Sequence, residues 1–232
     1  MPPGAVPDIR SRRAAWHRNL VELFAALARA YPSGSAENVG GVTLARTGAP
    51  SSSFNCAVAL DLPVSLEGLE DRIEAMFVRS GTPWHIVATP ETAPLFEGVA
   101  QRFHLTERII HPGLAWRPLP DTMPPAPEGF DIRVVQDTRE AREFGRTSLM
   151  GFGLPTNLFD PWLGGMFARG SAARRLHGVL YVGYVGDRPV ATSMRFTSGD
   201  IAGIYVVATL PEFRRRGYAS ALTYRAALDG RE

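Results

Sequence analysis

Three apolar segments joined by two short turns constrain the second half of the chain most strongly. Residues 179–185, 190–196 and 201–208 are rich in β-branched and aromatic side chains. Gly186–Asp187 separates the first two segments, and residues 198–200 separate the last two. A two-residue Gly–Asp connection is typical of a β-hairpin, because glycine adopts the positive φ angles that such turns need. We therefore expect three successive strands that turn back on one another.

Apolar spacing and capping residues predict the remaining elements. Helices are expected at residues 14–31, from the N-cap Ser65 to Gly81, from Thr89 and Pro90 to Phe103, from Asp137 onwards with a capping box to Glu140, near residues 162–168, and at about residues 217–229. Short strands are expected at residues 41–46, 54–60 and 84–88 and around Ile132 and Val134, with a further extended piece at Ile109 and Ile110. The fold class is α/β (α+β), with a mixed sheet flanked by helices and a smaller α/β module before it.

A proline-rich stretch divides the chain. Prolines occupy positions 118, 120, 124, 125 and 127. Proline at this density gives a stiff, extended linker. We therefore predict a first module at residues 1–125 and a second at residues 126–232.

The composition excludes several classes of protein. A single cysteine, Cys56, cannot support a disulfide framework or a cysteine-based zinc site. All 25 basic residues are arginine, so mechanisms that need a lysine, such as Schiff-base or P-loop chemistry, are excluded. The N-terminal segment lacks the apolar stretch of a secretory signal, and no apolar run approaches the roughly 18 residues of a membrane span. We expect a cytoplasmic protein with no membrane partner.

Neither a metal nor a nucleic acid is expected as a partner. The five histidines are scattered without the spacing of metal ligands, so we predict no metal site. Acidic and basic residues are interspersed, which argues against a general nucleic-acid surface.

The segment that carries chemistry is IAGIYVVATLPEFRRRGYASA, residues 201–221. It combines a strand, a turn, Arg214, Arg215 and Arg216, then Gly217 and a helix. Cations at a helix N-terminus are unfavourable by about 0.3–1 kcal/mol each, because that end of the helix is already positive. The arrangement becomes favourable when an anion binds there, and the small residues Gly217 and Ala219 let a phosphate approach the backbone.

The pattern R-x-x-G-x-A at Arg214, Gly217 and Ala219 resembles the acetyl-coenzyme A motif of the GNAT superfamily of N-acetyltransferases. The chain also resembles a bacterial subgroup of this superfamily that carries a diverged N-terminal module. This resemblance lies in the wider segment GIYVVATLPEFRRRGYASALT and, in the first half, in PWHIVATPETAPLFEGVAQRF and PGLAW. The chain departs from that subgroup at Val206, where a polar residue such as asparagine is common. The resemblance implies an acetyl-CoA-dependent N-acetyltransferase that uses no metal.

The resemblance also implies a role for each matching position. Backbone amides of Arg215, Arg216, Gly217, Tyr218, Ala219 and Ser220, together with Arg214, would bind the pyrophosphate of acetyl-CoA. The strand at Val207, Ala208 and Thr209 would pair with the pantetheine arm, and the Val207 N–H would polarise the thioester carbonyl. Tyr205, two residues before Val207 on a strand, would face the substrate amine as the candidate catalytic side chain. The aromatic residues Phe152, Phe159, Trp162 and Phe167 lie where family members build the acceptor pocket, or they pack a core.

Family members continue beyond the helix that follows this motif, with a further strand, a helix and a hairpin. The sequence stops at Glu232. We therefore expect either a fragment of a longer protein or a reduced one, in which the first module or a second copy of the chain covers the open strand edge.

Two functions remain open at this point. One is transfer of an acetyl group to a primary amine of a small molecule or peptide. The other is a non-catalytic acyl-CoA-binding or protein-interaction module. A third and weaker interpretation assigns the three arginines to nucleic-acid binding. A homodimer is an assembly that the sequence leaves open.

Overall fold

The computed structural model describes residues 9–31, 33–116, 118–158 and 178–231. The chain divides into two compact units, one of Met1–His104 with Thr197–Gly203 and one of Leu105–Phe196 with Ile204–Glu232. The predicted module boundary near residue 125 stays a prediction. The helix predicted near residues 162–168, with Phe159, Trp162 and Phe167, lies outside the described residues.

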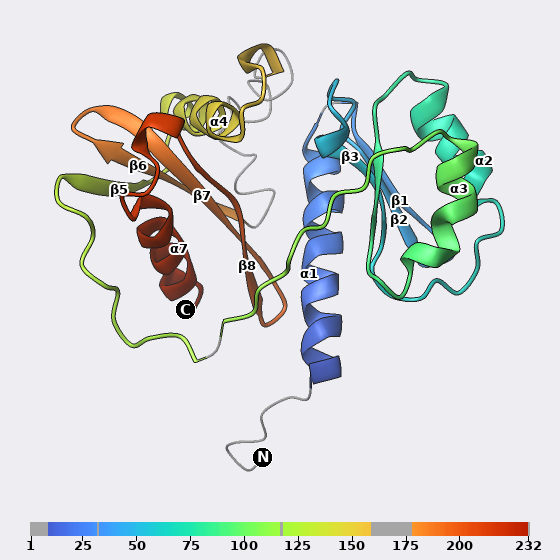
Figure 1. Cartoon of the computed structure of the whole chain (residues 1–232), viewed down its shortest axis with the longest axis horizontal. Coiled ribbons are helices and arrows are strands. Elements are labelled where there is room, and N and C mark those ends of the chain that lie inside the picture. The colour runs from blue at the N-terminus through green and yellow to red at the C-terminus, as the bar shows by residue number, and fades with distance from the viewer. Residues whose placement is uncertain (1–8, 32, 117, 159–177, 232) are drawn as a thin grey trace. The chain divides into compact units, whose positions relative to one another are not determined.

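The first unit is built on a four-stranded sheet of order β1-β2-β3-β4 (Figure 1). Its strands are β1 (Ser35–Val39), β2 (Val42–Arg46), β3 (Asn55–Ala59) and β4 (His85–Ala88). The β1–β2 and β2–β3 pairs are antiparallel, whereas β4 runs parallel to β3 with Cys56 opposite His85 and Ala59 opposite Ala88. The sheet of the first unit is therefore mixed, and with its helices it forms the smaller α/β module expected before the second one.

Three helical segments accompany this sheet. They are α1 (Ile9–Ala30), α2 (Leu69–Ile73), which continues as a π-helical turn at Glu74–Val78, and α3 (Glu97–Arg102), which follows a 3-10 turn at Ala93–Phe96. The predicted helix at residues 14–31 is confirmed, because Leu20 and Phe24 of α1 pack against a buried cluster of β2 and β3 that includes Ala45, Cys56 and Val58.

Two predicted helix starts are wrong. The α2 helix begins after Gly68, and the Ser65 hydroxyl accepts a hydrogen bond from the Glu67 N–H as a local turn. The Thr89 hydroxyl accepts from the Thr92 N–H, but this is also a turn, and the α-helix begins only at Glu97. In each case a serine or threonine that hydrogen-bonds to the backbone two or three residues on favours a turn as readily as a cap.

The second unit carries the predicted meander. Its sheet has the order β5-β6-β7-β8, with β5 (Phe130–Val134), β6 (Gly178–Val185), β7 (Arg188–Ser198) and β8 (Ile201–Thr209). The β5–β6 and β6–β7 pairs are antiparallel. In the part of the chain that the structure describes, β8 is the outermost strand on its side of this sheet.

Two helices belong to the second unit, α4 (Thr138–Phe152) and α7 (Tyr218–Leu228). The predicted cap of α4 is confirmed, because the Asp137 carboxylate accepts a hydrogen bond of 2.8 Å from the Glu140 N–H. The Glu140 carboxylate in turn accepts from the Gln136 N–H, which satisfies a second backbone donor at this helix end. Gly153, in the left-handed conformation, ends α4.

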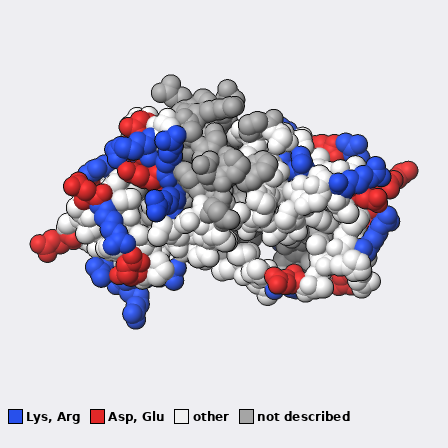
Figure 2. Space-filling view, turned by 90° about the horizontal axis from the view of Figure 1, so that it is seen from above, with Lys and Arg blue, Asp and Glu red and all other residues white. Residues whose placement is uncertain are grey.

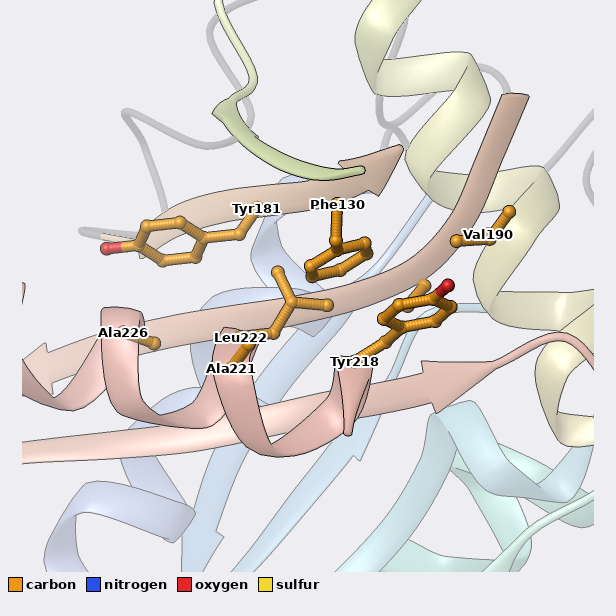
Figure 3. Close-up of a cluster of buried hydrophobic side chains, with 8 residues drawn as sticks. Phe130, Tyr181, Val190, Tyr218, Ala221, Leu222 and Ala226 are labelled. Atoms are coloured by element: carbon orange, nitrogen blue, oxygen red, sulfur yellow. The ribbon is translucent and has the colours of Figure 1, made fainter. Parts of the chain in front are cut away.

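The core beneath α7 is aromatic (Figure 3). Leu222 and Ala226 of α7 are fully buried against Tyr181 of β6 and Phe130 of β5. Gly183 of β6 is required there, because a Cβ at this position would lie 2.1 Å from Cζ of Phe130. The core therefore fixes α7 on one face of the sheet.

The proline-rich segment is attached to the second unit. The Trp116 ring packs edge-on against Tyr224 of α7, and the Arg231 guanidinium donates to the Leu119 carbonyl. The extended piece predicted at Ile109 and Ile110 belongs to neither described sheet, and the side chains of both residues are exposed.

Candidate acyl-CoA site on β8 and α7

The strand β8 contains a strained residue at its centre. Val206 has a φ angle of +53°, which places a β-branched residue in the left-handed region. Such a conformation costs of order 1–3 kcal/mol and persists where the surrounding structure enforces it. Here the Thr192 hydroxyl of β7 donates a 3.0 Å hydrogen bond to the Val206 carbonyl.

The register of β8 indicates a bulge. A two-residue turn at Gly199–Asp200 would place Val190 of β7 opposite Thr209 if the two strands had equal lengths. Instead the N–H of Leu210 donates to the Val190 carbonyl at 2.9 Å. The β8 strand therefore has one residue more than its partner over this stretch, which is the definition of a β-bulge.

The bulge changes the argument made for Tyr205. Side chains two residues apart share a face only where the strand is regularly extended. Val206, which lies between Tyr205 and Val207, does not have an extended conformation. Tyr205 is partly buried, and burial raises the pKa of its phenol to about 12. The phenol is therefore protonated near neutral pH and has a proton to donate.

The turn from β8 into α7 is shaped to present backbone N–H groups. After a 3-10 turn at Pro211–Phe213, Arg215 has a φ angle of +61° and Gly217 one of +81°. Left-handed residues spaced in this way form the concave backbone arrangement that binds anions. Gly217 is also the N-cap of α7, where no side chain accepts from the first helical N–H groups and no acidic residue lies in the first turn. The start of α7 thus offers a positive helix end without a protein anion to neutralise it.

The three arginines of this turn have different surroundings. Arg214 donates from Nη2 to the Gly151 carbonyl at 2.7 Å and from Nε to the Thr209 carbonyl at 3.2 Å. Arg216 donates to the Glu212 carbonyl and lies over the Phe213 ring. Among the described residues, Arg215 has no hydrogen-bond or ion-pair partner. The guanidinium group of Arg215 is therefore the one of the three that needs no rearrangement to meet a ligand.

The remaining predicted positions contribute backbone rather than side chains. Tyr218 is buried, so only its backbone faces the turn. A Cβ at Gly217 would lie 3.4 Å from Cγ of Pro127, which is ordinary contact, so its positive φ angle is what requires glycine. Ala219 is partly buried and Ser220 is exposed. At the end of β8, Ala208 is buried and Val207 is partly buried.

Thr209 has an unsatisfied hydroxyl. Its Oγ1 is buried and lacks a hydrogen-bond partner within the described part of the chain. A buried hydroxyl without a partner costs about 1–3 kcal/mol. A polar ligand at the end of β8 would satisfy it.

The first unit contains an internal counterpart of this site. In both units three strands of one sheet are followed by a helix whose N-cap is a left-handed glycine, Gly68 with φ +70° and ψ 0° for α2 and Gly217 with φ +81° and ψ 0° for α7. The first turn of α2 carries Glu70 and Asp71, which complement the helix end themselves. The two helix starts therefore share a backbone conformation and have opposite charge, and only the start of α7 favours an anionic ligand.

The sequence did not single out Gly151 of α4 as a site residue. A Cβ at Gly151 would lie 2.8 Å from Cβ of Ala208 and 3.2 Å from N of Thr209. Helix α4 therefore lies directly against the end of β8. A glycine within a helical pattern indicates that another backbone comes close to the helix. This pattern could have identified Gly151 from the sequence.

Other kinds of site are not apparent in the described ranges. Across residues 9–31, 33–116, 118–158 and 178–231, no group of three His, Cys, Asp or Glu side chains is placed to hold a metal ion. None of the helices that the structure describes has the length and apolarity to cross a lipid bilayer.

Comparison with known proteins agrees with this geometry. Residues 127–232 match the family model described as an acetyltransferase (GNAT) domain. This part of the chain is therefore a GNAT acetyltransferase domain, and the family resemblance drawn from residues 201–221 is confirmed. No curated protein matches the sequence.

Solved structures extend the likeness to the fold of nearly the whole chain. A GCN5-related N-acetyltransferase from Kribbella flavida matches with a TM-score of 0.63 and 17% identity, over 95% of this chain and 81% of that chain. A Drosophila protein matches with a TM-score of 0.43 and 12% identity, over 82% of this chain and 60% of that chain. A functionally unknown conserved protein from Staphylococcus epidermidis has a TM-score of 0.43 and 14% identity, over 87% and 80%. The first of these shows that the fold is GNAT-like, and the other two are too dissimilar to support a conclusion.

Proposed function

We propose that the second unit binds acetyl-CoA and transfers its acetyl group to a primary amine of a small molecule or peptide. The observation that carries the proposal is the anion-binding turn at Arg215 and Gly217, placed at the uncapped start of α7. Because a diphosphate is compact and doubly charged, it matches a concave set of backbone N–H groups at a positive helix end. The GNAT domain match at residues 127–232 supports acetyl-CoA as the source of that diphosphate.

The residues present fit acetyl-CoA along β8 and the turn. Backbone N–H groups from Arg215 to Ser220 would hold the diphosphate, and the Arg215 guanidinium would add charge. The outer edge of β8, which carries no strand among the described residues, would pair with the pantetheine arm through Val207, Ala208 and Thr209. The bulge at Val206 re-aims the backbone of the strand there, and a backbone N–H of Val207 would point at the thioester oxygen.

The chemistry required is modest. The amine, after losing a proton, attacks the thioester carbonyl carbon and forms a C–N bond and a tetrahedral oxyanion. The N–H of Val207 would stabilise that oxyanion, because its dipole is already oriented when the charge develops. The attacking nitrogen then gives up its extra proton to water, the C–S bond breaks, and the thiolate takes a proton from water to leave as CoA. The protonated Tyr205 phenol is the candidate donor of a hydrogen bond on this strand.

The direct test is an assay of CoA thiol release with acetyl-CoA and a panel of amines, amino acids, aminoglycosides and peptides. Calorimetric titration with desulfo-CoA measures binding without turnover. Saturable binding that Arg215→Ala weakens about tenfold supports the diphosphate site, since loss of a charge-assisted contact costs about 1.4 kcal/mol or more. Absence of binding at millimolar ligand would overturn the proposal.

A non-catalytic acyl-CoA-binding module is the second candidate. It is favoured by the position of β8 as the outermost strand in the described sheet, because an acceptor cleft needs a wall on that side. Both candidates require the turn at Arg215 and Gly217, whereas only the enzyme releases thiol. Binding of desulfo-CoA without thiol release from any amine would select this second function. A cytoplasmic location, a peptide or small-molecule acceptor and a homodimer stay predictions.

A further inference from the structure

The guanidinium of Arg214 is committed to two backbone carbonyls of its own chain. One belongs to Gly151, at the C-terminal end of α4, and the other to Thr209, the last residue of β8. Arginine presents several N–H donors in a fixed planar fork, so one side chain can hold two acceptors in a defined mutual geometry. Arg214 therefore joins the end of a helix, the end of a strand and its own turn.

The Gly151 carbonyl is a suitable acceptor because of its place in α4. The last four carbonyls of a helix have no partner within the helix, and that end is partially negative. At the end of α4, the Leu149 carbonyl accepts from the Leu154 N–H and the Met150 carbonyl accepts from the Gly153 N–H. The Gly151 carbonyl, the next in line, accepts from Arg214 instead. A cation at this end of the helix is favourable, whereas the same cation at the start of α7 is not.

The short distance between α4 and β8 depends on glycine. Any side chain at position 151 would collide with Ala208, because a Cβ on Gly151 would lie 2.8 Å from the Cβ of Ala208. Ala208 and Thr209 are two of the three residues proposed to pair with the pantetheine arm. The arginine contact and the glycine contact share Gly151 and Thr209, and together they hold α4 against the end of the acyl-CoA strand.

We propose that Arg214 is a positioning residue that couples helix α4 to the acyl-CoA strand and turn, and that it does not itself bind the diphosphate. This proposal rests on the proposed function for its effect on acyl-CoA, but the coupling itself exists without a ligand. Gly151 contributes to the same coupling, because the absence of a side chain lets α4 approach the end of β8. Arg215, one residue along, is by contrast a direct ligand through its charge.

Substitution by lysine separates the two roles. Lysine keeps the charge but offers a point donor on a flexible stem, so it cannot hold the Gly151 and Thr209 carbonyls together. We expect Arg214→Lys and Arg214→Ala to raise the Kd for desulfo-CoA by a similar factor, about tenfold. At position 215 the two substitutions should differ: we expect Arg215→Ala to raise the Kd about tenfold and Arg215→Lys to raise it less, because a phosphate also accepts the point charge of lysine.

Salt dependence distinguishes an arginine whose charge contacts the ligand from one that positions the backbone. The Kd of desulfo-CoA should rise with salt less steeply in Arg215→Ala than in the wild type, because a charge on the ligand has lost its partner. In Arg214→Ala the salt dependence should equal that of the wild type, although binding is weaker. Arg139→Ala, at the other end of α4 and exposed in a pair with Glu143, is the matched control and should change neither quantity.

Hydrogen exchange of the ligand-free protein tests the coupling independently of acyl-CoA. In Arg214→Ala and in Gly151→Ala, amides at residues 149–154 and at residues 207–216 should exchange faster together, while those of β6 keep their wild-type rates. The double variant should exchange no faster than the more affected single variant, because both substitutions disrupt the same contact between α4 and the end of β8.

Three results would overturn the proposal. These are wild-type affinity in Arg214→Lys, a flattened salt dependence in Arg214→Ala equal to that in Arg215→Ala, and exchange at residues 149–154 that Arg214→Ala leaves unchanged. If the wild-type protein binds no desulfo-CoA but the exchange pattern is as expected, the proposed function fails and the coupling stands.

Discussion

The ring of Tyr218, the first residue of α7, stacks on the ring of Phe130, the first residue of β5, with centroids 4.3 Å and planes 14° apart (Figure 3). Tyr218 is 6% exposed, so its side chain is committed to the core although its position lies inside the predicted cofactor motif. The stack fixes the first turn of α7 on the sheet. It thereby fixes the direction of the backbone N–H groups that the proposed diphosphate site uses.

Removing this stack should affect stability and binding together. We expect Tyr218→Ala to lower the free energy of unfolding by about 3–5 kcal/mol, the range for truncating a buried aromatic side chain. Tyr218→Phe keeps the ring and should stay close to the wild type in both urea denaturation and desulfo-CoA titration. An equal loss in the two variants would show that the hydroxyl, rather than the stacked ring, holds the start of α7.

The strain at Val206 predicts a stabilising substitution. Asparagine tolerates the left-handed conformation better than a β-branched residue does. We therefore expect Val206→Asn to raise the free energy of unfolding by about 1 kcal/mol, measured by urea denaturation. Ile204→Asn is the control on the same strand, where φ is not positive and the side chain packs on the core beneath α7, and it should destabilise. A loss at Val206 equal to that at Ile204 would mean that the strand is not strained there.

The buried phenol of Tyr205 predicts a loss of stability at high pH. Burial raises its pKa to about 12 in the folded protein, against about 10 in the unfolded chain. The folded state therefore holds this proton more tightly, and the stabilisation is complete below about pH 10 and lost as the pH rises towards 12.

Tyr205→Phe removes that dependence. Between about pH 9 and pH 11.5, the variant should lose less free energy of unfolding than the wild type, by up to about 2 kcal/mol. Urea denaturation at each pH measures the difference. Burial also raises the pKa of Tyr31, Tyr181 and Tyr184, so the variant should still lose some stability at high pH. Parallel curves for variant and wild type would contradict the assignment to Tyr205.

Local sequence signals were sufficient for the meander of the second unit. The predicted strands at residues 179–185, 190–196 and 201–208 correspond to β6, β7 and β8, and the predicted helix at 217–229 corresponds to α7. Here the apolar pattern and the turn residues agree with the tertiary fold. The strand β1 (Ser35–Val39) was not predicted, because its sequence SAENV is polar and its strand character comes from pairing with β2.

The candidate site was predictable in outline from Arg214, Gly217 and Ala219. The detail was not, because it depends on backbone angles and on contacts distant in the sequence. No local signal in a valine-rich strand indicates the positive φ angle of Val206. The hydrogen bond from Arg214 to Gly151 joins residues 63 positions apart, so a motif cannot distinguish an arginine that binds phosphate from one that holds a helix.

Asn55 of β3 is the strongest candidate for a single polar residue on which the first unit depends. It is fully buried, and its Oδ1 accepts from the N–H and hydroxyl of Thr47 and from the N–H of Gly48. Its Nδ2 donates to the carbonyls of Ala49, Ser51 and Pro83. The side chain thus holds the loop between β2 and β3 together with Pro83, which lies two residues before β4.

Replacing this amide by a carboxyl keeps the shape and removes the donor. Asn55→Asp leaves three carbonyls facing an oxygen, and each buried group without a partner costs about 1–3 kcal/mol, so we expect a loss of at least about 3 kcal/mol in the free energy of unfolding. Burial would raise the pKa of the introduced carboxyl above its unfolded value of about 3.9, so its neutral form is favoured in the folded state. The loss should therefore be larger at about pH 8 than at about pH 5, because stability falls as the pH rises towards the folded-state pKa.

Asn38→Asp, at an exposed position whose Oδ1 accepts from the Gly41 N–H, is the matched control and should change stability little at either pH. Urea denaturation of both variants at the two pH values is the measurement, and equal behaviour of the two would show that the amide donor of Asn55 does not hold this loop.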